Sequence, residues 1–252
     1  MHHIALLLTL RLIEEEQDSF PMEAQALACA IKRLLQQETV HRQTVAITAA
    51  VLGKEEENTS IRLSLSGNDV TSVIASLHEL SARSPLRLCQ QRYEVASIEL
   101  AHPIWSRVNS WADILAPSAA RIIHFSFATP LITKEPANQM SRDALPFPEP
   151  IPLFSSVIDS WSGLGGPGLP ADARQLVQAT DCVISLYRLR TCPVAFGEHS
   201  CTGYLGWIEY ECRQSDHPYL ASLISLARLA FFTGAGYHTA QGMGVTNVRL
   251  RS

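Results

Sequence analysis

The stretch Phe232-Thr233-Gly234-Ala235-Gly236-Tyr237-His238-Thr239-Ala240-Gln241-Gly242-Met243-Gly244 stands out in the 252-residue sequence because it contains four glycines. Glycine tolerates positive φ angles and lets a backbone approach a ligand closely. A run of glycines can present several backbone N–H groups to one small volume, which suits a phosphate. The stretch is therefore either a flexible loop between two secondary-structure elements or a phosphate-binding loop, and the rest of the chain must distinguish the two.

The composition is typical of a soluble globular protein. The chain is long enough for one large domain or for two domains of roughly 100–130 residues each. Apolar residues make up 46% and charged residues 17%, and no stretch reaches the roughly 18 apolar residues of a membrane span. Residues 1–11 have neither a basic region nor a small-residue cleavage site, so we expect a strand there rather than a signal peptide. We therefore expect a cytoplasmic protein without a membrane partner.

The six cysteines indicate neither a metal site nor disulfides. They lie far apart and form no C-x-x-C pair: Cys29, Cys89, Cys182, Cys192, Cys201 and Cys212. Zinc ligand sets usually include one closely spaced pair, so we expect no metal site. Without an export signal, reduced and partly buried thiols are expected. No cofactor is expected either.

The charge distribution leaves room for a cationic face although the net charge is −4. Seven of the 24 acids fall in two short clusters, residues 14–18 and 55–57, which we expect to be solvated loops. The remaining 17 acids face 20 lysines and arginines. From Leu186 onward, six arginines stand against four acids. Binding of nucleic acid is therefore not excluded by the charge.

Hydrophobic periodicity predicts the same order of elements in both halves of the chain. In the first half we expect strands at residues 4–13, 45–52, 59–66 and 86–100, with helices at 22–37 and after Asn68 or Asp69. In the second half we expect strands at 122–132, 182–196, 203–212 and 245–250, with helices at 153–161 and after Pro218. Each half thus reads βαββαβ.

This order predicts an α+β protein of two tandem ferredoxin-like (RRM-like) domains. Residues 101–120 contain two prolines and two tryptophans that break the pattern. We therefore place the domains at residues 1–104 and 118–252. The glycine stretch joins the last helix of the second domain to its last strand.

Four passages carry a resemblance to a known family. They are the loop Gly234-x-Gly236-x-x-Thr239-x-x-Gly242-Met243-Gly244; Phe127-Ala128-Thr129-Pro130; Phe147-Pro148-x-Pro150 through Phe154 and Trp161; and His41 after the first helix, followed by a small-residue strand ending at Leu52-Gly53. Together with the tandem domains, they resemble the RAMP proteins of CRISPR systems. More narrowly, the chain resembles the CRISPR-associated (Cas) endoribonucleases that process repeat RNA into guide RNA.

The resemblance implies cleavage without a metal. The 2′-OH of one nucleotide attacks the adjacent phosphate and leaves a 2′,3′-cyclic phosphate and a 5′-OH. His41 matches the position of the family's catalytic histidine, and histidine can serve in either proton role near neutral pH. From the spacing alone, His41 is better explained as an exposed histidine at the end of a helix, where the helix dipole favours it; its match to the family position favours catalysis instead. Arg42, then Lys32 or Arg33, are the candidates for stabilising the phosphate charge.

The strand after His41 departs from the family pattern. The family often has a basic residue, a Pro-Phe pair and a serine there, whereas this chain has Val45-Ala46-Ile47-Thr48-Ala49-Ala50-Val51. The second member of the catalytic group is therefore left open.

The expected RNA contacts lie mostly in the glycine loop. The backbone amides around Gly234, Gly236, Gly242 and Gly244 are expected to hold phosphates, with Thr239 and Gln241 adding side-chain donors and His238 touching a phosphate or a base. Arg188 and Arg190 alternate on one strand and so share a face. They are either RNA-backbone contacts or part of a solvated strand face.

The expected partner is CRISPR repeat RNA, with other Cas effector-complex subunits and a homodimer left open. One alternative is a RAMP subunit that holds guide RNA through the same loop without cutting it. Another is a small-molecule regulatory module built on the ferredoxin-like fold. His41 favours the enzyme, because a purely structural subunit does not need that histidine.

Overall fold

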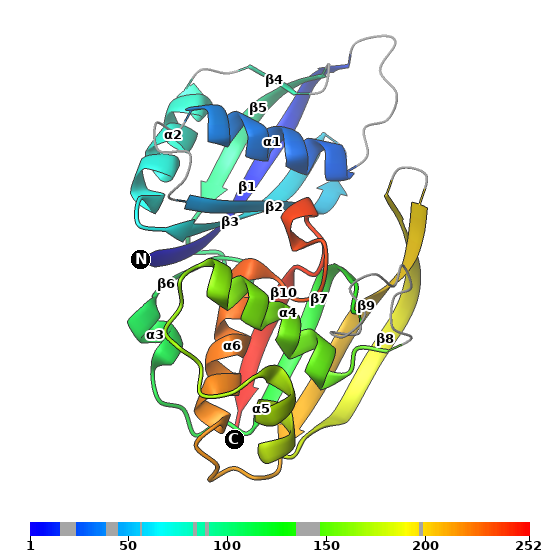
Figure 1. Cartoon of the computed structure of the whole chain (residues 1–252). Helices are drawn as coiled ribbons and strands as arrows, with labels where there is room; N and C mark the ends of the chain where they lie inside the picture. The colour runs from blue at the N-terminus through cyan, green and yellow to red at the C-terminus, as the bar shows by residue number, and fades with distance from the viewer. Residues whose placement is uncertain are drawn as a thin grey trace. The chain divides into compact units, whose positions relative to one another are not determined.

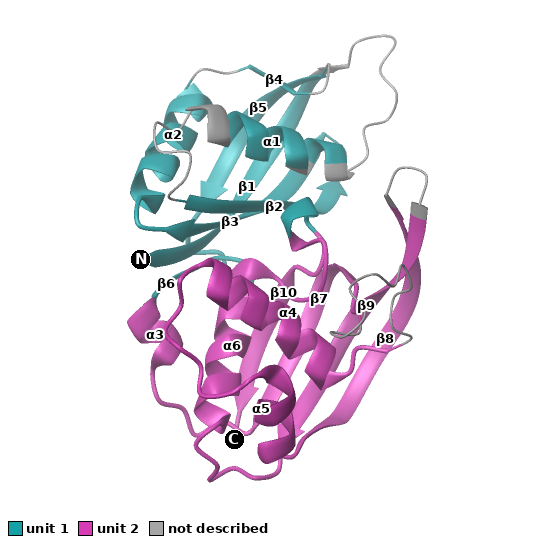
Figure 2. Cartoon of the chain, in the orientation of Figure 1, with its two compact units in different colours: residues 1–110, 240–242 teal, residues 111–239, 243–252 magenta. Residues whose placement is uncertain are grey.

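The computed structural model (Figure 1) describes residues 1–15, 24–38, 45–55, 57–82, 85–88, 91–134, 147–196 and 199–252. The chain forms two compact units, Met1–Ser110 with Ala240–Gly242 and Trp111–Thr239 with Met243–Ser252 (Figure 2). The main division thus falls within the passage 101–120 that breaks the sequence pattern. Independent folding of residues 1–104 and 118–252 stays a prediction.

The first unit contains one antiparallel sheet with two helices. In chain order its elements are β1 (His2–Glu15), α1 (Ala24–Glu38), β2 (Val45–Glu55), β3 (Asn58–Gly67), α2 (Val70–Ala82), β4 (Leu86–Leu88), β5 (Gln91–Glu99) and β6 (Arg107–Ser110). The strand order is β2-β3-β1-β5-β4, and β6 pairs with the beginning of β1. Figure 1 shows α1 and α2 on one face of this sheet. The arrangement is the ferredoxin-like one that the βαββαβ order predicts.

The core of the first unit follows from matching periodicities. Side chains of a strand alternate between its two faces, whereas those of a helix repeat every three or four residues. The helix-facing side of the sheet and the apolar stripes of the two helices form one buried cluster, which includes Leu6, Leu8 and Leu10 of β1, Leu27 and Ile31 of α1, and Val73 and Leu77 of α2. Burial of these side chains is the main force that holds the helices on the sheet.

The opposite side of β1 and β3 is buried as well, although it carries polar residues. His3 is 0% exposed and its Nδ1 lies 2.9 Å from the Ser66 hydroxyl across the strand pair. Arg62 is 2% exposed, and its Nε donates to the Trp105 carbonyl oxygen at 3.1 Å. Burial lowers the pKa of His3 to about 4, with smaller contributions from the N-terminal amine and His2. His3 is therefore a neutral interior residue at pH 7 and not part of an open groove.

The second unit repeats the architecture. Its elements are α3 (Trp111–Leu115), β7 (Ile122–Leu131), α4 (Pro150–Gly163), α5 (Ala173–Ala179), β8 (Cys182–Phe196), β9 (His199–Cys212), α6 (Leu220–Thr233) and β10 (Thr246–Arg251). Its antiparallel sheet has the order β10-β7-β9-β8. Numbered within the unit this is 4-1-3-2, the ferredoxin-like order. The predicted fold class, two tandem ferredoxin-like domains, is confirmed.

An aromatic cluster joins α4 to the sheet of the second unit. The Phe125 ring meets Phe154 of α4 at a centroid distance of 6.2 Å and Tyr210 of β9 at 5.9 Å, both edge to face. The Tyr210 hydroxyl donates to the Pro148 carbonyl oxygen at 2.8 Å. The proline-led entry to α4 is thus tied to the sheet through a buried hydrogen bond.

Four elements were not expected from the sequence: β6, α3, α5 and a 3₁₀ turn at Thr239–Gln241. Helix α5 has only seven residues, and Asp172 caps its N-terminus: the carboxylate accepts from the Gln175 amide at 2.8 Å. An aspartate before a short amphipathic run is an N-cap signal, but the glycines and prolines before it suggested a loop. None of the helices that the structure describes has the length and apolar character needed to cross a membrane.

The described cysteines are free thiols. Cys182 and Cys212 are direct cross-strand partners in β8 and β9, and both are buried. The hydrogen bond to Cys212 and burial raise the pKa of Cys182, so this thiol stays protonated. Cys29, Cys192 and Cys201 are free and partly buried, while Cys89 lies outside the described residues.

The buried His3 predicts a loss of stability in mild acid. Between pH 6.5 and about 4, His3 gains a proton in the unfolded chain but not in the folded one, so the free energy of unfolding falls as the pH decreases through this window. The loss is at most about 3 kcal/mol. Urea unfolding at pH 7.0, 5.5 and 4.5 measures it. His3→Gln should flatten this dependence, whereas His2→Gln, at an exposed neighbouring position, should not. Equal slopes in all three proteins would refute the assignment.

Candidate functional site

The glycine loop links α6 to β10 and closes on itself. The Ala235 amide donates to the Gly244 carbonyl oxygen at 2.9 Å, and the Met243 amide donates to the His238 carbonyl oxygen at 3.2 Å. Gly244 has a φ of 62°, and a Cβ at this position would overlap the Ala235 carbonyl oxygen. Only glycine combines this backbone conformation with such a close approach.

The end of β7 holds the C-terminal side of the loop. The Gly244 amide donates to the Pro130 carbonyl oxygen at 2.9 Å. The Val245 amide donates to the Thr129 hydroxyl, also at 2.9 Å. The passage Phe127-Ala128-Thr129-Pro130 therefore supplies both acceptors that fix the exit of the loop. This is a physical reason for a threonine followed by a proline at the end of this strand.

The N-terminal side of the loop is fixed by two further acceptors. The Gly236 amide donates to the Ser156 hydroxyl of α4 at 2.7 Å. The Tyr237 amide donates to the Ile132 carbonyl oxygen at 2.8 Å. The Lys134 ammonium lies 5.4 Å from the centre of the Tyr237 ring, within the range of a cation–π interaction.

These bonds change the role expected for the glycines. The amides of Gly236 and Gly244 donate to Ser156 and Pro130, and the Gly234 amide donates to the Ala230 carbonyl oxygen at 2.9 Å. An N–H group already paired inside the protein is not directed at a phosphate. The three glycines therefore give the loop its shape. RNA binding by the loop stays a prediction, and it falls to other groups of the same loop.

Residues Ala240–Gly242 at the tip of the loop belong to the first unit. There the Lys32 ammonium of α1 donates to the Ala240 carbonyl oxygen at 3.3 Å. Gly242 lies so close to β2 that a Cβ would come within 2.7 Å of the Ala49 carbonyl oxygen and 3.3 Å of Ala50. The small residues that distinguish β2 in the sequence thus allow the two backbones to approach.

The predicted catalytic residues are described only in part. Lys32 lies beside the tip of the loop, so one proposed catalytic cation and one proposed RNA-binding segment meet within the first unit. His41 and Arg42 lie outside the described residues. Their roles remain predictions.

The side chains of the loop tip differ in exposure. Thr239, Ala240 and Gln241 form a short 3₁₀ turn. Gln241 is exposed, whereas Thr239 and His238 are partly buried. His238 has a φ of 62°, an uncommon conformation for a residue with a side chain. Gln241 is thus the loop donor most accessible to a ligand.

Arg188 and Arg190 lie on β8, at the edge of the second sheet, and both are exposed. Arg188 is the cross-strand partner of Trp207 in β9. The sequence correctly predicted a strand with two arginines here, but it did not indicate that Trp207 lies opposite Arg188. Whether the two arginines contact RNA stays a prediction.

A group of side chains that the sequence analysis missed lies next to these arginines. His124 Nδ1 lies 3.0 Å from Glu209 Oε1, and Arg251 forms an ion pair with the same carboxylate oxygen. The His124 ring stacks on Trp207 with a centroid distance of 5.4 Å and an interplanar angle of 24°. Alternation in β7 could have placed His124 on the face opposite Phe125. Its partners Trp207 and Glu209 could not be predicted, because they lie more than 80 residues away in the sequence. In the described part of the chain, no three His, Cys, Asp or Glu side chains gather as a metal site would require.

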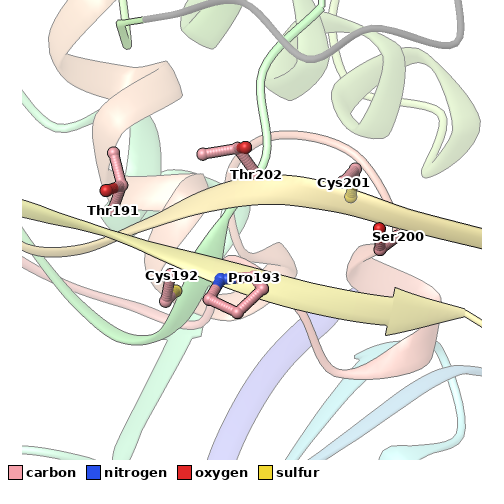
Figure 3. Close-up of a pocket in the computed structure, with 6 residues that line it drawn as sticks. All are labelled: Thr191, Cys192, Pro193, Ser200, Cys201 and Thr202. Atoms are coloured by element: carbon pink, nitrogen blue, oxygen red, sulfur yellow. The ribbon is translucent and has the colours of Figure 1, made fainter.

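A pocket of about 300 Å³ lies on the β8–β9 hairpin (Figure 3), lined by Thr191, Cys192, Pro193, Ser200, Cys201 and Thr202. Burial raises the pKa of the Cys192 and Cys201 thiols, against the opposing effects of Arg190 and Lys134. Neither thiol is therefore an activated nucleophile. We assign this pocket no chemistry.

Comparison with known proteins shows a sequence similarity in the second unit. Residues 125–246 match the family model described as CRISPR-associated endoribonuclease Cas6. The second unit of this chain is thus similar in sequence to the Cas6 endoribonucleases. The match runs from Phe125 within β7 to Thr246, the first residue of β10, and therefore includes the whole glycine loop. The resemblance drawn from the sequence motifs is confirmed.

Solved Cas6 structures share the fold over the whole chain. A Cas6 protein with a single histidine-to-alanine substitution is 22% identical, with a TM-score of 0.74 and coverage of 100% of both chains. A product complex of a Cas6 from Thermus thermophilus is 20% identical, with a TM-score of 0.74 and coverage of 98% of this chain and 99% of the other. A Cas6-related protein from Pyrococcus furiosus is 15% identical, with a TM-score of 0.57 and 98% coverage of both chains. None of the curated proteins matches the sequence.

The crowded backbone at Gly244 predicts a severe effect of the smallest side chain. Gly244→Ala should lower the free energy of unfolding by at least about 2 kcal/mol, because it combines an unfavourable φ with a clash against the Ala235 carbonyl oxygen. Gly168→Ala is the matched control, since a Cβ there meets nothing within 4 Å. Urea unfolding of the two variants measures the difference. A Gly244→Ala variant as stable as the Gly168→Ala variant would contradict the described loop geometry.

Proposed function

We propose that this protein is an endoribonuclease that cuts CRISPR repeat RNA without a metal ion. The observation that carries the proposal is the match of residues 125–246 to the Cas6 endoribonuclease family. A Cas6 of the same fold has been solved with its product, and another carries a substitution of a histidine. Both facts favour an RNA-cleaving enzyme that uses a histidine.

The proposed reaction is an internal transesterification. A base removes the proton of a 2′-OH, the 2′-oxygen forms a bond to the adjacent phosphorus, and the bond from phosphorus to the 5′-oxygen breaks. An acid then gives the departing 5′-oxygen a proton, so the products are a 2′,3′-cyclic phosphate and a 5′-OH. We assign His41 to one of these two proton transfers, because imidazole exchanges protons near neutral pH.

Cations are needed because negative charge builds on the phosphate oxygens in the transition state. We assign this role to Arg42 and Lys32. The Lys32 ammonium has three N–H donors, of which one serves the Ala240 carbonyl oxygen. The remaining donors suit a phosphate that lies against the tip of the loop. Lys32 would thus hold the loop and the substrate with the same group.

We assign RNA binding to the loop around Gly234, Gly236, Gly242 and Gly244, with Thr239, Gln241 and His238 as its side-chain contacts. Arg188 and Arg190 would contact the RNA backbone from β8. Binding through cations releases counterions, so the affinity should fall steeply with salt. Association with other Cas subunits, homodimer formation and a cytoplasmic location belong to the same proposal.

Replacing the proposed catalytic histidine should stop cleavage and spare binding. We expect the wild type to cut its repeat RNA in EDTA and to leave 2′,3′-cyclic phosphate ends. His41→Ala should lower the cleavage rate by about 10²–10⁴-fold, the usual contribution of general acid–base catalysis. His78→Ala, at an exposed position of α2, should cut like the wild type. Single-turnover cleavage on denaturing gels measures the rates, and fluorescence anisotropy measures binding.

Other results would point to other functions. RNA that is bound tightly but never cut by the wild type would indicate a non-cleaving RAMP subunit. Cleavage that EDTA abolishes would contradict a metal-independent reaction. Absence of any salt-sensitive RNA affinity, together with binding of a metabolite, would favour a regulatory module.

Lys32 can be tested separately from His41. Lys32→Ala should lower the single-turnover cleavage rate by roughly 10-fold or more, because it removes a charge-assisted donor from the transition state. Lys54→Ala, which removes an exposed lysine from β2 of the same unit, is the matched control. An unchanged rate in Lys32→Ala, with a reduced rate in Arg33→Ala, would transfer the role to Arg33.

A further inference from the structure

The helices α4, α5 and α6 lie on one face of the sheet of the second unit (Figure 1), and none of the helices that the structure describes lies on the other face. On β7, Phe125 and Phe127 are buried on the helix-covered side, so His124 and Ser126 lie on the other side. Cross-strand pairing places Glu209 and Arg249 on either side of His124. The helix-free face therefore carries a set of polar and aromatic side chains.

Four of these side chains form what we call the sheet-face cluster: His124, Trp207, Glu209 and Arg251. The Glu209 side chain is only 7% exposed although none of the described helices covers this face. It is enclosed by its own partners, because His124 and Arg251 both contact its Oε1 atom. A carboxylate this buried needs such partners, and they fix it in place.

The buried carboxylate fixes the two aromatic rings beside it. Glu209 holds His124 by a hydrogen bond, and the His124 ring stacks nearly parallel on Trp207. Trp207 is partly exposed in the folded chain. One face of the indole is thus supported by a ring that is itself held by a hydrogen bond to Glu209. Such a braced, partly exposed aromatic ring costs little entropy when a flat ligand stacks on it.

The charge around the indole favours an anionic ligand. Four arginines of this sheet, Arg188, Arg190, Arg249 and Arg251, are exposed, against Glu209 and the partly buried Glu211. Arg251 neutralises Glu209. Arg188 is the direct cross-strand partner of Trp207, so a cation stands next to the ring.

We propose that the helix-free face of the sheet β10-β7-β9-β8 binds a single-stranded segment of RNA, with one base stacked on Trp207 and phosphates against Arg188 and Arg249. Stacking platforms flanked by cations are the general solution for unpaired nucleic acid, and four-stranded sheets of this topology present such aromatic residues on their open face. His124 and Glu209 are positioning residues that brace the indole. The inference rests on the proposed function for the source of the RNA, the repeat.

The test uses the full chain and a probe that the proposed reaction cannot cut. Fluorescein-labelled 2′-O-methyl A12 lacks the attacking hydroxyl, and anisotropy measures its affinity over a range of salt concentrations. Trp207→Ala should weaken binding by about 5- to 100-fold, the usual loss of one base–aromatic stack. Trp207→Phe should retain most of the affinity. Arg188→Gln and Arg249→Gln should each reduce the slope of log K against log salt by about 1.

Two variants of the same unit serve as matched controls. Tyr187 is 58% exposed and lies next to Arg188 on β8, but it points to the other side of the sheet and meets Phe147. Arg174 is an exposed arginine of α5. Tyr187→Ala and Arg174→Gln should bind the probe as the wild type does. If Trp207→Ala binds like Tyr187→Ala, or if both arginine variants keep the full salt slope, the proposal is wrong.

If Trp207→Ala does not fold, crosslinking of the wild type tests whether RNA contacts Trp207. A 2′-O-methyl 12-mer with 4-thiouridine is irradiated with the protein, and adducts are located by mass spectrometry. Adducts on the β9 peptide that contains Trp207 support the proposal, and adducts confined to other elements overturn it. Repeat cleavage is measured separately. A protein that cuts the repeat but shows no effect of Trp207 refutes this inference alone, whereas stacking without cleavage refutes only the proposed enzyme.

Discussion

The hydrogen bond from the Ala235 amide to the Gly244 carbonyl oxygen closes the glycine loop, and the rest of the site depends on that closure. It requires a glycine at position 244 and leaves several loop amides pointing into the protein. Each of these needs an acceptor, since an unpaired buried N–H is costly. Thr129, Pro130 and Ser156 supply the acceptors. Motifs that lie far apart in the sequence are thus joined by hydrogen bonds: the glycine loop supplies the donors, and β7 and α4 supply the acceptors.

The sequence predicted well those helices and strands whose apolar residues repeat regularly along the element. Alternating apolar residues placed β7, and helical spacing placed α6, because each pattern reports directly on one buried face. The short α5 was missed, since a single N-cap aspartate carries less weight than the glycines before it. The loop contacts could not be predicted either. Gly236 and its acceptor Ser156 are 80 residues apart, and nothing in the sequence indicates which hydroxyl a given amide meets. The same holds for His124 and Glu209.

The two faces of the second sheet illustrate how one fold separates stability from recognition. The helix-covered face packs aromatic rings such as Phe125, Phe154 and Tyr210 edge to face, which fixes the sheet. On the other face, His124 and Arg251 both contact the buried carboxylate of Glu209. That carboxylate contributes order rather than net stability, because its desolvation offsets much of the attraction. What the carboxylate provides is a defined position for the rings of His124 and Trp207.

The tip of the glycine loop has a consequence for how the chain can be divided. Residues Ala240–Gly242 come near the end of the sequence, yet they pack with Lys32 and Ala49 as part of the first unit. Neither unit is therefore one continuous segment. A fragment that stops at Ser110 would lack Ala240–Gly242, which pack against Ala49. A fragment that starts at Trp111 would contain these three residues but not the strand β2 against which they pack. Replacement of the C-terminal half must therefore preserve Ala240–Gly242, because these three residues complete the first unit.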